Sequence, residues 1–212
     1  MDSKTLILCT ATVLLLATSL IYGIKFLGRR NYLLGVEWLV VTLSTSNLLV
    51  FLLSGAQTAY KISYFCDAFS RGFGIPIIAT AGLMAVTHRY KPSTFTDIVF
   101  FAAAIAGTAV LVSAGFVAKP LPYFYVLMWS AYSVYLAYFA YRLAHAGQVG
   151  HAFGVIVVLV LGETVAWTYD LFQFPHDDGR ILFYTFALTT WSYTVVQLYY
   201  SYGALERAES AA

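Results

Sequence analysis

Three carboxylic acids interrupt long apolar stretches of the chain: Glu37, Glu163 and Asp170. Glu163 and Asp170 are seven residues apart, a spacing that places both on one face of a helix, and Trp167 falls on that same face. Desolvation disfavours the charged form of an acid in apolar surroundings, so such groups could stay neutral and donate a proton. We therefore take all three as candidate catalytic acids.

Aromatic residues accompany these acids. Trp38 directly follows Glu37, and other large rings stand near the middle of apolar stretches, among them Trp129, Tyr132, Trp167 and Trp191. Membrane interfaces attract tyrosine and tryptophan to the ends of membrane helices, but that preference does not explain rings at mid-depth. The face of an aromatic ring attracts a cation, most strongly in a dry site. A neutral acid facing an aromatic-lined cavity could therefore protonate an alkene or epoxide and guide the carbocation.

A third group surrounds residue 70. Asp67 and Arg71 are four residues apart and could pair on one helix face. Gly72, Gly74 and Pro76 follow and indicate a bent helix start with close backbone packing. Asp67 and Arg71 could form an ordinary interfacial salt bridge or part of a substrate pocket.

Each acid also has a purely structural interpretation. Glu37 could bond to a serine or tyrosine of a neighbouring helix, and Asp170 could meet water at the lipid headgroups. Glu163 could be satisfied by an interhelical hydrogen bond. The sequence leaves these alternatives open.

Composition indicates the surroundings of these residues. The chain has 212 residues, of which 10% are charged and 60% hydrophobic, whereas a soluble domain has about a quarter charged residues. The mean hydropathy of +0.76 agrees, and excludes an ordinary water-soluble domain. A net charge of +2 gives no reason to expect nucleic acid as a partner. The expected surroundings are the lipid bilayer.

Seven apolar stretches are long enough to cross a bilayer, which needs roughly 20 helical residues. They predict an all-α integral membrane bundle of seven transmembrane helices, forming one domain over 1–212. We expect residues 54–71 to hold the longest link, as a loop or an interfacial turn. The predicted helices cover about 5–27, 32–53, 72–90, 97–118, 121–142, 152–174 and 180–203.

Lysine and arginine indicate the orientation of this multi-pass protein, because cytoplasmic loops are enriched in them. Five of these residues fall at the end that carries the N-terminus: Lys4, Lys61, Arg71, Lys119 and Arg180. Seven fall at the other end: Lys25, Arg29, Arg30, Arg89, Lys91, Arg142 and Arg207. This favours an N-terminus outside and a C-terminus in the cytoplasm.

Two familiar classes are excluded or disfavoured. A retinal protein needs a lysine in its last helix, and no lysine follows Lys119. A zinc hydrolase needs several ligands at one depth, yet His88, His145 and His151 fall at the cytoplasmic end and His176 in an external loop. We expect neither a metal nor a cofactor.

With Glu37-Trp38 in the second helix, Asp67 before the third, and acids and aromatics late in the chain, the sequence resembles a family of membrane-bound terpene cyclases. These seven-helix proteins of meroterpenoid and indole-terpenoid pathways have a similar length and no soluble domain. The resemblance implies cyclisation of a hydrophobic prenylated substrate, started by proton transfer from an acid within the membrane to an epoxide or alkene.

The family pairs an acid in the second helix with one late in the chain. Glu37 matches the first, but 180–203 contains no acid, and Asp170 is the nearest candidate for the second. The resemblance thus makes Glu37 or Asp170 the general acid, with the other or Glu163 assisting. Rings lining the cavity would be Trp38, Tyr132, Trp167 and Trp191.

A different class fits the same residues. A proton-coupled transporter, or a membrane receptor for a small molecule or peptide, would also use acids within the membrane together with Arg71 and tyrosines. A purely structural subunit would leave the acids without a purpose. The cyclase is the leading hypothesis and the transporter its rival.

Overall fold

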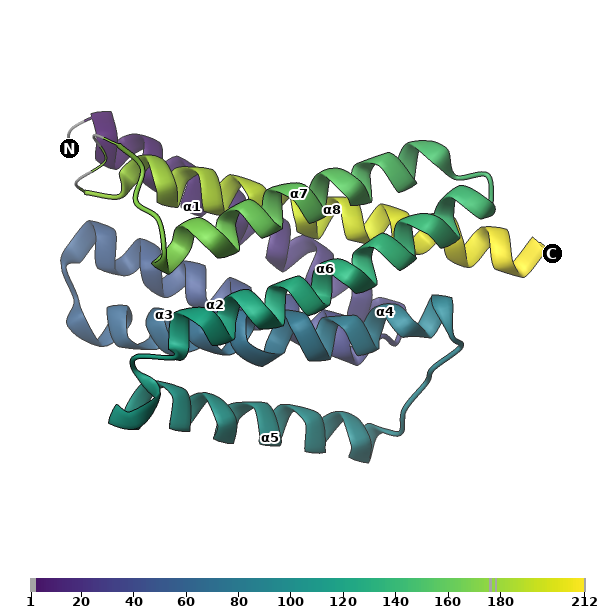
Figure 1. Ribbon diagram of the computed structural model, residues 1–212, viewed down its shortest axis with the longest axis horizontal. Coiled ribbons are helices and arrows are strands. Elements are labelled where there is room, and N and C mark those ends of the chain that lie inside the picture. The colour runs from purple at the N-terminus through teal and green to yellow at the C-terminus, as the bar shows by residue number, and fades with distance from the viewer. Residues whose placement is uncertain (1–2, 176, 178, 212) are drawn as a thin grey trace.

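The computed structural model describes residues 3–175, 177 and 179–211, and within them it contains helices and no strand. The long helices run side by side (Figure 1), with α5 at one edge, packed against α3 and η1. In chain order the elements are α1 (Ser3–Gly28), α2 (Tyr32–Ser54), α3 (Gln57–Phe69), η1 (Ser70–Ala79), α4 (Thr80–Thr87), α5 (Thr94–Ser113), η2 (Gly115–Val117), α6 (Leu121–His145), α7 (Val149–Asp170) and α8 (Ile181–Ala211).

The expected all-α class is confirmed. Five helical segments are long and apolar enough to cross a membrane: Ser3–Gly28, Tyr32–Ser54, Gln57–Thr87, Thr94–Ser113 and Val149–Asp170. The helices α6 and α8 are also long, but their many tyrosines make them less apolar.

The third helix begins much earlier than predicted. Residues 54–71 were expected as a loop or interfacial turn, yet α3, η1 and α4 follow one another without a break from Gln57 to Thr87. Gly55 ends α2 in the left-handed conformation, with φ 70°, and the chain turns within two residues. The small residues of α3 form its buried face: Ala59, Ser63 and Cys66. Small polar residues here signal close packing on α2 instead of a loop.

The middle of this long helix is a π-helix, η1, which contains Pro76. Proline has no N–H to donate to the helical ladder, and π-helical turns are frequent at functional sites. Gly72, Gly74 and Pro76, expected at a bent helix start, lie instead in the middle of a continuous helix, where their backbone is π-helical and Gly72 and Gly74 pack closely on neighbouring groups.

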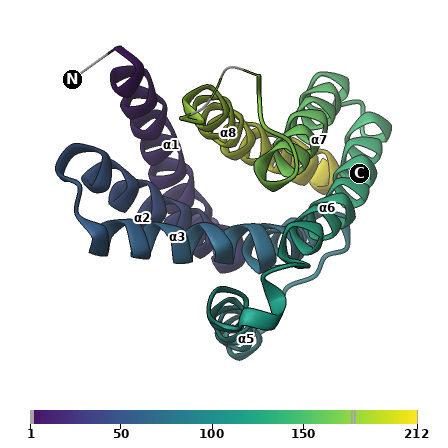
Figure 2. The ribbon, with the colours of Figure 1, turned by 60° about the vertical axis from the view of Figure 1, so that its left-hand side comes forward.

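One end of the bundle is closed by aromatic rings and ion pairs. Phe26 of α1 packs on Tyr199 and Tyr202 of α8, with ring centroids 5.1 and 5.5 Å apart. Arg29 pairs with Glu206 at 2.6 Å, and Arg142 of α6 pairs with Glu209. At the other end the beginnings of α1 and α8 stand apart (Figure 2).

The last helix is fixed at its start by Asp177. Its carboxylate accepts hydrogen bonds from the backbone N–H groups of Leu182 and Phe183, at 3.1 and 2.9 Å. Burial raises the pKa of the Asp177 carboxyl, but the backbone hydrogen bonds from the first turn of α8 and the positive charge of Arg180 together lower it by more, so the net shift is downward.

Phe26 should carry much of the stability of the closed end, because it is fully buried between α1 and α8. We expect Phe26→Ala to lower the free energy of unfolding in detergent by ~3–5 kcal/mol. Phe153→Ala is the matched control, since Phe153 is 70% exposed on α7, and it should change stability by less than ~0.5 kcal/mol. Equal losses in the two variants would contradict this assignment of the core.

Candidate functional site

A cavity of about 600 Å³ lies among α1, α2, α3, η1, α7 and α8, with Tyr125 of α6 also in its wall. Its size is typical of small-molecule sites. Its apolar wall includes Leu15, Val41, Ile75, Leu188 and Trp191, and its rim of tyrosines includes Tyr60, Tyr64, Tyr125, Tyr169 and Tyr184. Polar side chains enter the wall where α7 ends: Asp67, Arg71, Asp170 and Arg180.

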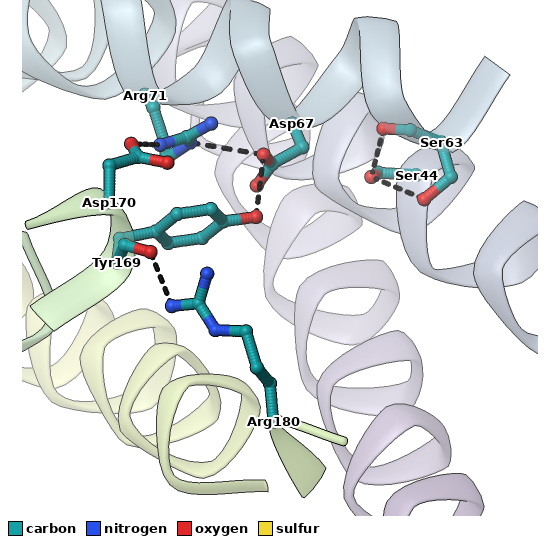
Figure 3. A network of polar contacts seen from close by, with 7 residues as sticks. All are labelled: Ser44, Ser63, Asp67, Arg71, Tyr169, Asp170 and Arg180. Atoms are coloured by element: carbon teal, nitrogen blue, oxygen red, sulfur yellow. Dashed lines mark hydrogen bonds and ion pairs between the residues drawn. The ribbon is translucent and has the colours of Figure 1, made fainter. Parts of the chain in front are cut away.

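Arg71 organises this polar part of the cavity (Figure 3). Its Nε donates to Asp67 Oδ2 at 3.0 Å, and its Nη1 donates to Asp170 Oδ2 at 2.9 Å. The guanidinium carbon lies 4.0 Å from the ring centre of Tyr125 and 3.7 Å from that of Tyr169. Arg71 is therefore a buried cation held by two carboxylates and sandwiched between two rings. We call these five residues the Arg71 cluster.

Local helix structure explains how the cluster forms. Asp67 lies one turn before Arg71 on the same long helix, so the predicted pairing is present. Asp170 is the last residue of α7, and Tyr169 beside it donates its hydroxyl to Asp67 Oδ2 at 3.0 Å. Because Asp170 uses Oδ2 to hold Arg71, its place in the structure is that of an ion-pair partner.

Glu37 is fully buried and lies behind the cavity wall. Neither of its carboxyl oxygens has a hydrogen-bond partner among the described residues. The carboxyl group rests on Gly74 of η1, where an added Cβ would lie 2.3 Å from Oε1 and 2.4 Å from Oε2. Ser70, which lines the cavity, faces Glu37, and its hydroxyl makes no hydrogen bond that meets normal geometry. Ser70 thus neighbours both the buried acid and the cavity.

Trp38 lies beside Glu37 in the core, fully buried, and its indole N–H has no partner. Tyr132 is also buried and packs edge-on against Trp129, with ring centres 5.4 Å apart. Trp129 in turn packs on Trp191 at 4.8 Å. Of the four rings expected to line a cavity, only Trp191 lies in its wall, with Trp38 and Tyr132 in the surrounding core.

The acid–indole–acid stripe on α7 does not converge on one cavity. Glu163 accepts hydrogen bonds from Ser130 and Ser133 of α6, at 2.5 and 2.9 Å, which is the interhelical alternative left open by the sequence. Trp167 is 45% exposed on the outside of the bundle. The four-residue spacing offsets Trp167 from Glu163 by about 40° around the helix axis, and this offset lies on the exposed side of α7. Only Asp170 of the three reaches the cavity.

Several cavity residues were missing from the sequence interpretation. Ser70, Tyr169 and Arg180 line the cavity, as do Tyr60, Tyr64 and Tyr184. Ser70 and Tyr169 are direct sequence neighbours of Arg71 and Asp170, which is the one signal that could have singled them out.

No three His, Cys, Asp or Glu side chains come together to hold a metal ion in the part of the chain that the structure describes. His176, which was expected in an external loop, lies outside the described residues. Comparison with protein-family models, with curated proteins and with solved structures finds no match to this chain.

The contact between Gly74 and Glu37 can be tested by a double-mutant cycle. Gly74→Ala should cost about 1–3 kcal/mol, since the added methyl group overlaps the carboxyl group. In a Glu37→Ala background the same change should cost much less, because the overlapping atoms are gone. Thermal unfolding in detergent measures all four proteins.

The control for this cycle is Gly150→Ala. A Cβ at Gly150 in α7 would meet nothing within 4 Å, so the substitution should be neutral or mildly stabilising. If Gly74→Ala costs the same with and without the Glu37 carboxyl group, the two residues are not in contact.

Proposed function

We propose that the chain is a membrane-embedded terpene cyclase that binds a linear prenyl chain in the cavity and starts ring closure by protonating an alkene or epoxide. One observation carries the proposal. Glu37 is a completely buried acid without a hydrogen-bond partner among the described residues, and it faces Ser70, which lines a cavity with apolar and aromatic walls.

Glu37 is the proton donor in this proposal. An unpaired charge buried among apolar groups is very costly, so the carboxyl group in this position carries its proton. A serine hydroxyl both donates and accepts a hydrogen bond. Ser70 can therefore take the proton of Glu37 while it gives its own to the substrate. Protonation of an alkene leaves a carbocation at the more substituted carbon, and protonation of an epoxide opens its C–O bond with the same result.

The rest of the reaction needs no further reagent. A neighbouring double bond of the chain attacks the carbocation and closes a ring, and the new cation loses a proton. That proton returns through Ser70 to the Glu37 carboxylate, so the net reaction is an isomerisation. Trp191 and the cavity tyrosines offer ring faces that stabilise the cationic intermediates.

The other acids take different roles from those first considered. Asp170 and Asp67 hold Arg71 in place, and Glu163 joins α6 to α7. The described part of α8 has acids only near its C-terminal end, at Glu206 and Glu209. The proposed mechanism therefore uses a single intramembrane acid.

A proton-coupled transporter is the second candidate, favoured by the shape of the bundle. The beginnings of α1 and α8 are apart beside the cavity, whereas their far ends are joined by rings and by the Arg29–Glu206 ion pair. A carrier stopped with one side open would have this form, with Glu37 as its proton site. A transporter would move its ligand unchanged across the membrane in response to a proton gradient.

We also propose that all seven long helical segments span the bilayer, with the N-terminus outside. At 25 residues, α6 is long enough despite its tyrosines. Burial of Arg71 among its carboxylates removes one cation from the outer surface, so that Lys4, Lys61, Lys119 and Arg180 remain there against the larger inner set.

Labelling of single cysteines tests this topology. Gln57 is the first residue of the long helix that ends at Thr87, Lys91 follows that helix, and both are exposed. In intact cells, a membrane-impermeant maleimide should label Gln57→Cys, and should label Lys91→Cys only after lysis. The buried Cys9 and Cys66 are replaced by alanine in both proteins. Labelling of both sites from one side would contradict the crossing, and the reverse pattern would contradict the orientation.

Substitution of Glu37 tests the catalytic proposal. Purified protein in detergent is incubated with linear prenyl alcohols, prenylated phenols and their terminal epoxides, and the products are analysed by mass spectrometry. Glu37→Gln removes the proton donor but keeps the size of the side chain, so cyclisation should fall by about 100-fold or more.

Glu163→Gln is the matched control, because Glu163 lies between α6 and α7 away from the cavity. It should keep most of the activity. Full cyclisation by Glu37→Gln would end the proposed mechanism. Uptake of an unchanged ligand into proteoliposomes, driven by a proton gradient and lost in Glu37→Gln, would instead establish the transporter.

A further inference from the structure

We infer that Arg180 binds an anionic headgroup, so that the substrate is a prenyl-type amphiphile ending in a carboxylate or phosphate. The inference rests on the proposed function, because it names the substrate class of the same cavity. It depends on Arg180 and its surroundings, which the proposed mechanism does not use.

The Arg180 side chain is held against the end of α7. Its Nη2 donates to the carbonyl oxygens of Tyr169 and of Thr168, the latter at 3.1 Å. The guanidinium carbon lies 4.5 Å from the ring centre of Phe183. The backbone of Arg180 has φ 53°, a left-handed conformation that is uncommon for a residue with a side chain. These contacts fix a cation in the cavity wall before any ligand arrives.

Arg180 still has donors to offer. Among the described residues neither its Nη1 nor its buried Nε has a hydrogen-bond partner. Arg29, Arg71 and Arg142 each form an ion pair with a carboxylate, but among the described residues none lies within ion-pair distance of Arg180. The nearby Asp177 carboxylate instead accepts hydrogen bonds from the first turn of α8. In Figure 3 one terminal nitrogen of Arg180 meets the backbone oxygen of Tyr169, and the other has no dashed contact to the residues drawn.

The charges around the cavity allow an anion at this place. Asp67 and Asp170 both direct Oδ2 at Arg71, so these two carboxylates are already engaged by a cation. Arg180 supplies a second positive charge. Because Nη2 already donates to Thr168 and Tyr169, the Nη1 group of Arg180, which makes no hydrogen bond to the described residues, is the donor that can give charge-assisted hydrogen bonds to a carboxylate or phosphate oxygen.

The remainder of the cavity selects an apolar chain. From Arg180 the wall continues along α8 to Ala187, Leu188 and Trp191, ten residues beyond the start of that helix. A headgroup on Arg180 therefore leaves its chain among apolar residues, within the same cavity wall as Ser70.

Binding measurements separate this inference from the catalytic proposal. Trp191 in the cavity wall reports binding through tryptophan fluorescence of the purified protein in detergent, because a ligand displaces water from the indole. The probes are farnesoic acid, farnesyl phosphate, farnesol and farnesylamine, which share one chain and differ in headgroup. Oleic acid tests whether any fatty acid suffices.

Farnesoic acid or farnesyl phosphate should bind at least about tenfold more tightly than farnesol, as expected for a charge-assisted hydrogen bond. Arg180→Gln should abolish that preference and leave farnesol binding unchanged. Arg180→Lys should keep part of it. Arg207→Gln removes an exposed cation from the far end of α8 and should change nothing. Because the preference is a ratio within one protein, partial loss of folded protein does not affect it.

Equal binding of acid and alcohol by the natural protein, or an unchanged preference in Arg180→Gln, would overturn the inference. Tighter binding of farnesylamine would also do so, and would assign headgroup recognition to Asp67 and Asp170. Oleic acid binding as well as farnesoic acid would overturn the prenyl part of the inference. Glu37→Gln should bind farnesoic acid normally, so a failure of catalysis and a failure of recognition give different results.

Discussion

A buried guanidinium has to be matched by carboxylates, and the match at Arg71 determines how the two halves of this bundle meet. Asp67 comes from the same long helix, but Asp170 comes from the last residue of α7, 99 residues later in the chain. Tyr125 of α6 covers one face of the cation and Tyr169 covers the other. Loss of one partner of a buried ion pair typically costs 3–5 kcal/mol. The end of α7 is therefore held at one depth beside η1, and the cavity between α1 and α8 takes its shape from that position.

Glu37 is also a buried ionisable group, but unlike Arg71 it has no oppositely charged partner in the described structure. Arg71 contacts two carboxylates and two aromatic rings. The Glu37 carboxyl group instead contacts the backbone of Gly74 and lies near the Ser70 hydroxyl, which makes no hydrogen bond among the described residues. A buried polar group without a partner costs stability, and few such groups persist in a folded protein without a reason. The π-helix η1 places Ser70 and Gly74 against this acid. Glu37, whose two carboxyl oxygens lack partners among the described residues, therefore lies beside the cavity, which is why we place the chemistry there.

The hydropathy and the length of the apolar stretches predicted most of the helices, because a helix that crosses a bilayer must be long and apolar, and both properties are visible in the local sequence. The i,i+4 pairing of Asp67 with Arg71 could also be predicted, because it depends only on the local spacing of two residues on one helix. The rotation of each helix about its own axis could not be predicted from the sequence. That rotation places Trp167 outside and turns Glu163 toward Ser130. It depends on which helices pack together, and a single sequence does not contain that information. Residues 57–71 were mistaken for a link since small polar residues serve equally in loops and in tight helix contacts.

The cavity has an unpaired acid behind one wall and a fixed cation in another, so its two ends differ and a ligand with two different ends would bind in one orientation. An amphiphile with an anionic head would enter such a site in one orientation, with its head on Arg180 and its chain among the apolar residues. A cyclase and a transporter share this need, but they place opposite demands on the closed end of the bundle. A carbocation has to be kept from water, so a cyclase benefits if the Arg29–Glu206 and Arg142–Glu209 pairs stay closed. A transporter has to open that end in every cycle. The aromatic packing of Phe26 on Tyr199 and Tyr202 adds to the cost of opening, and this cost favours the enzyme.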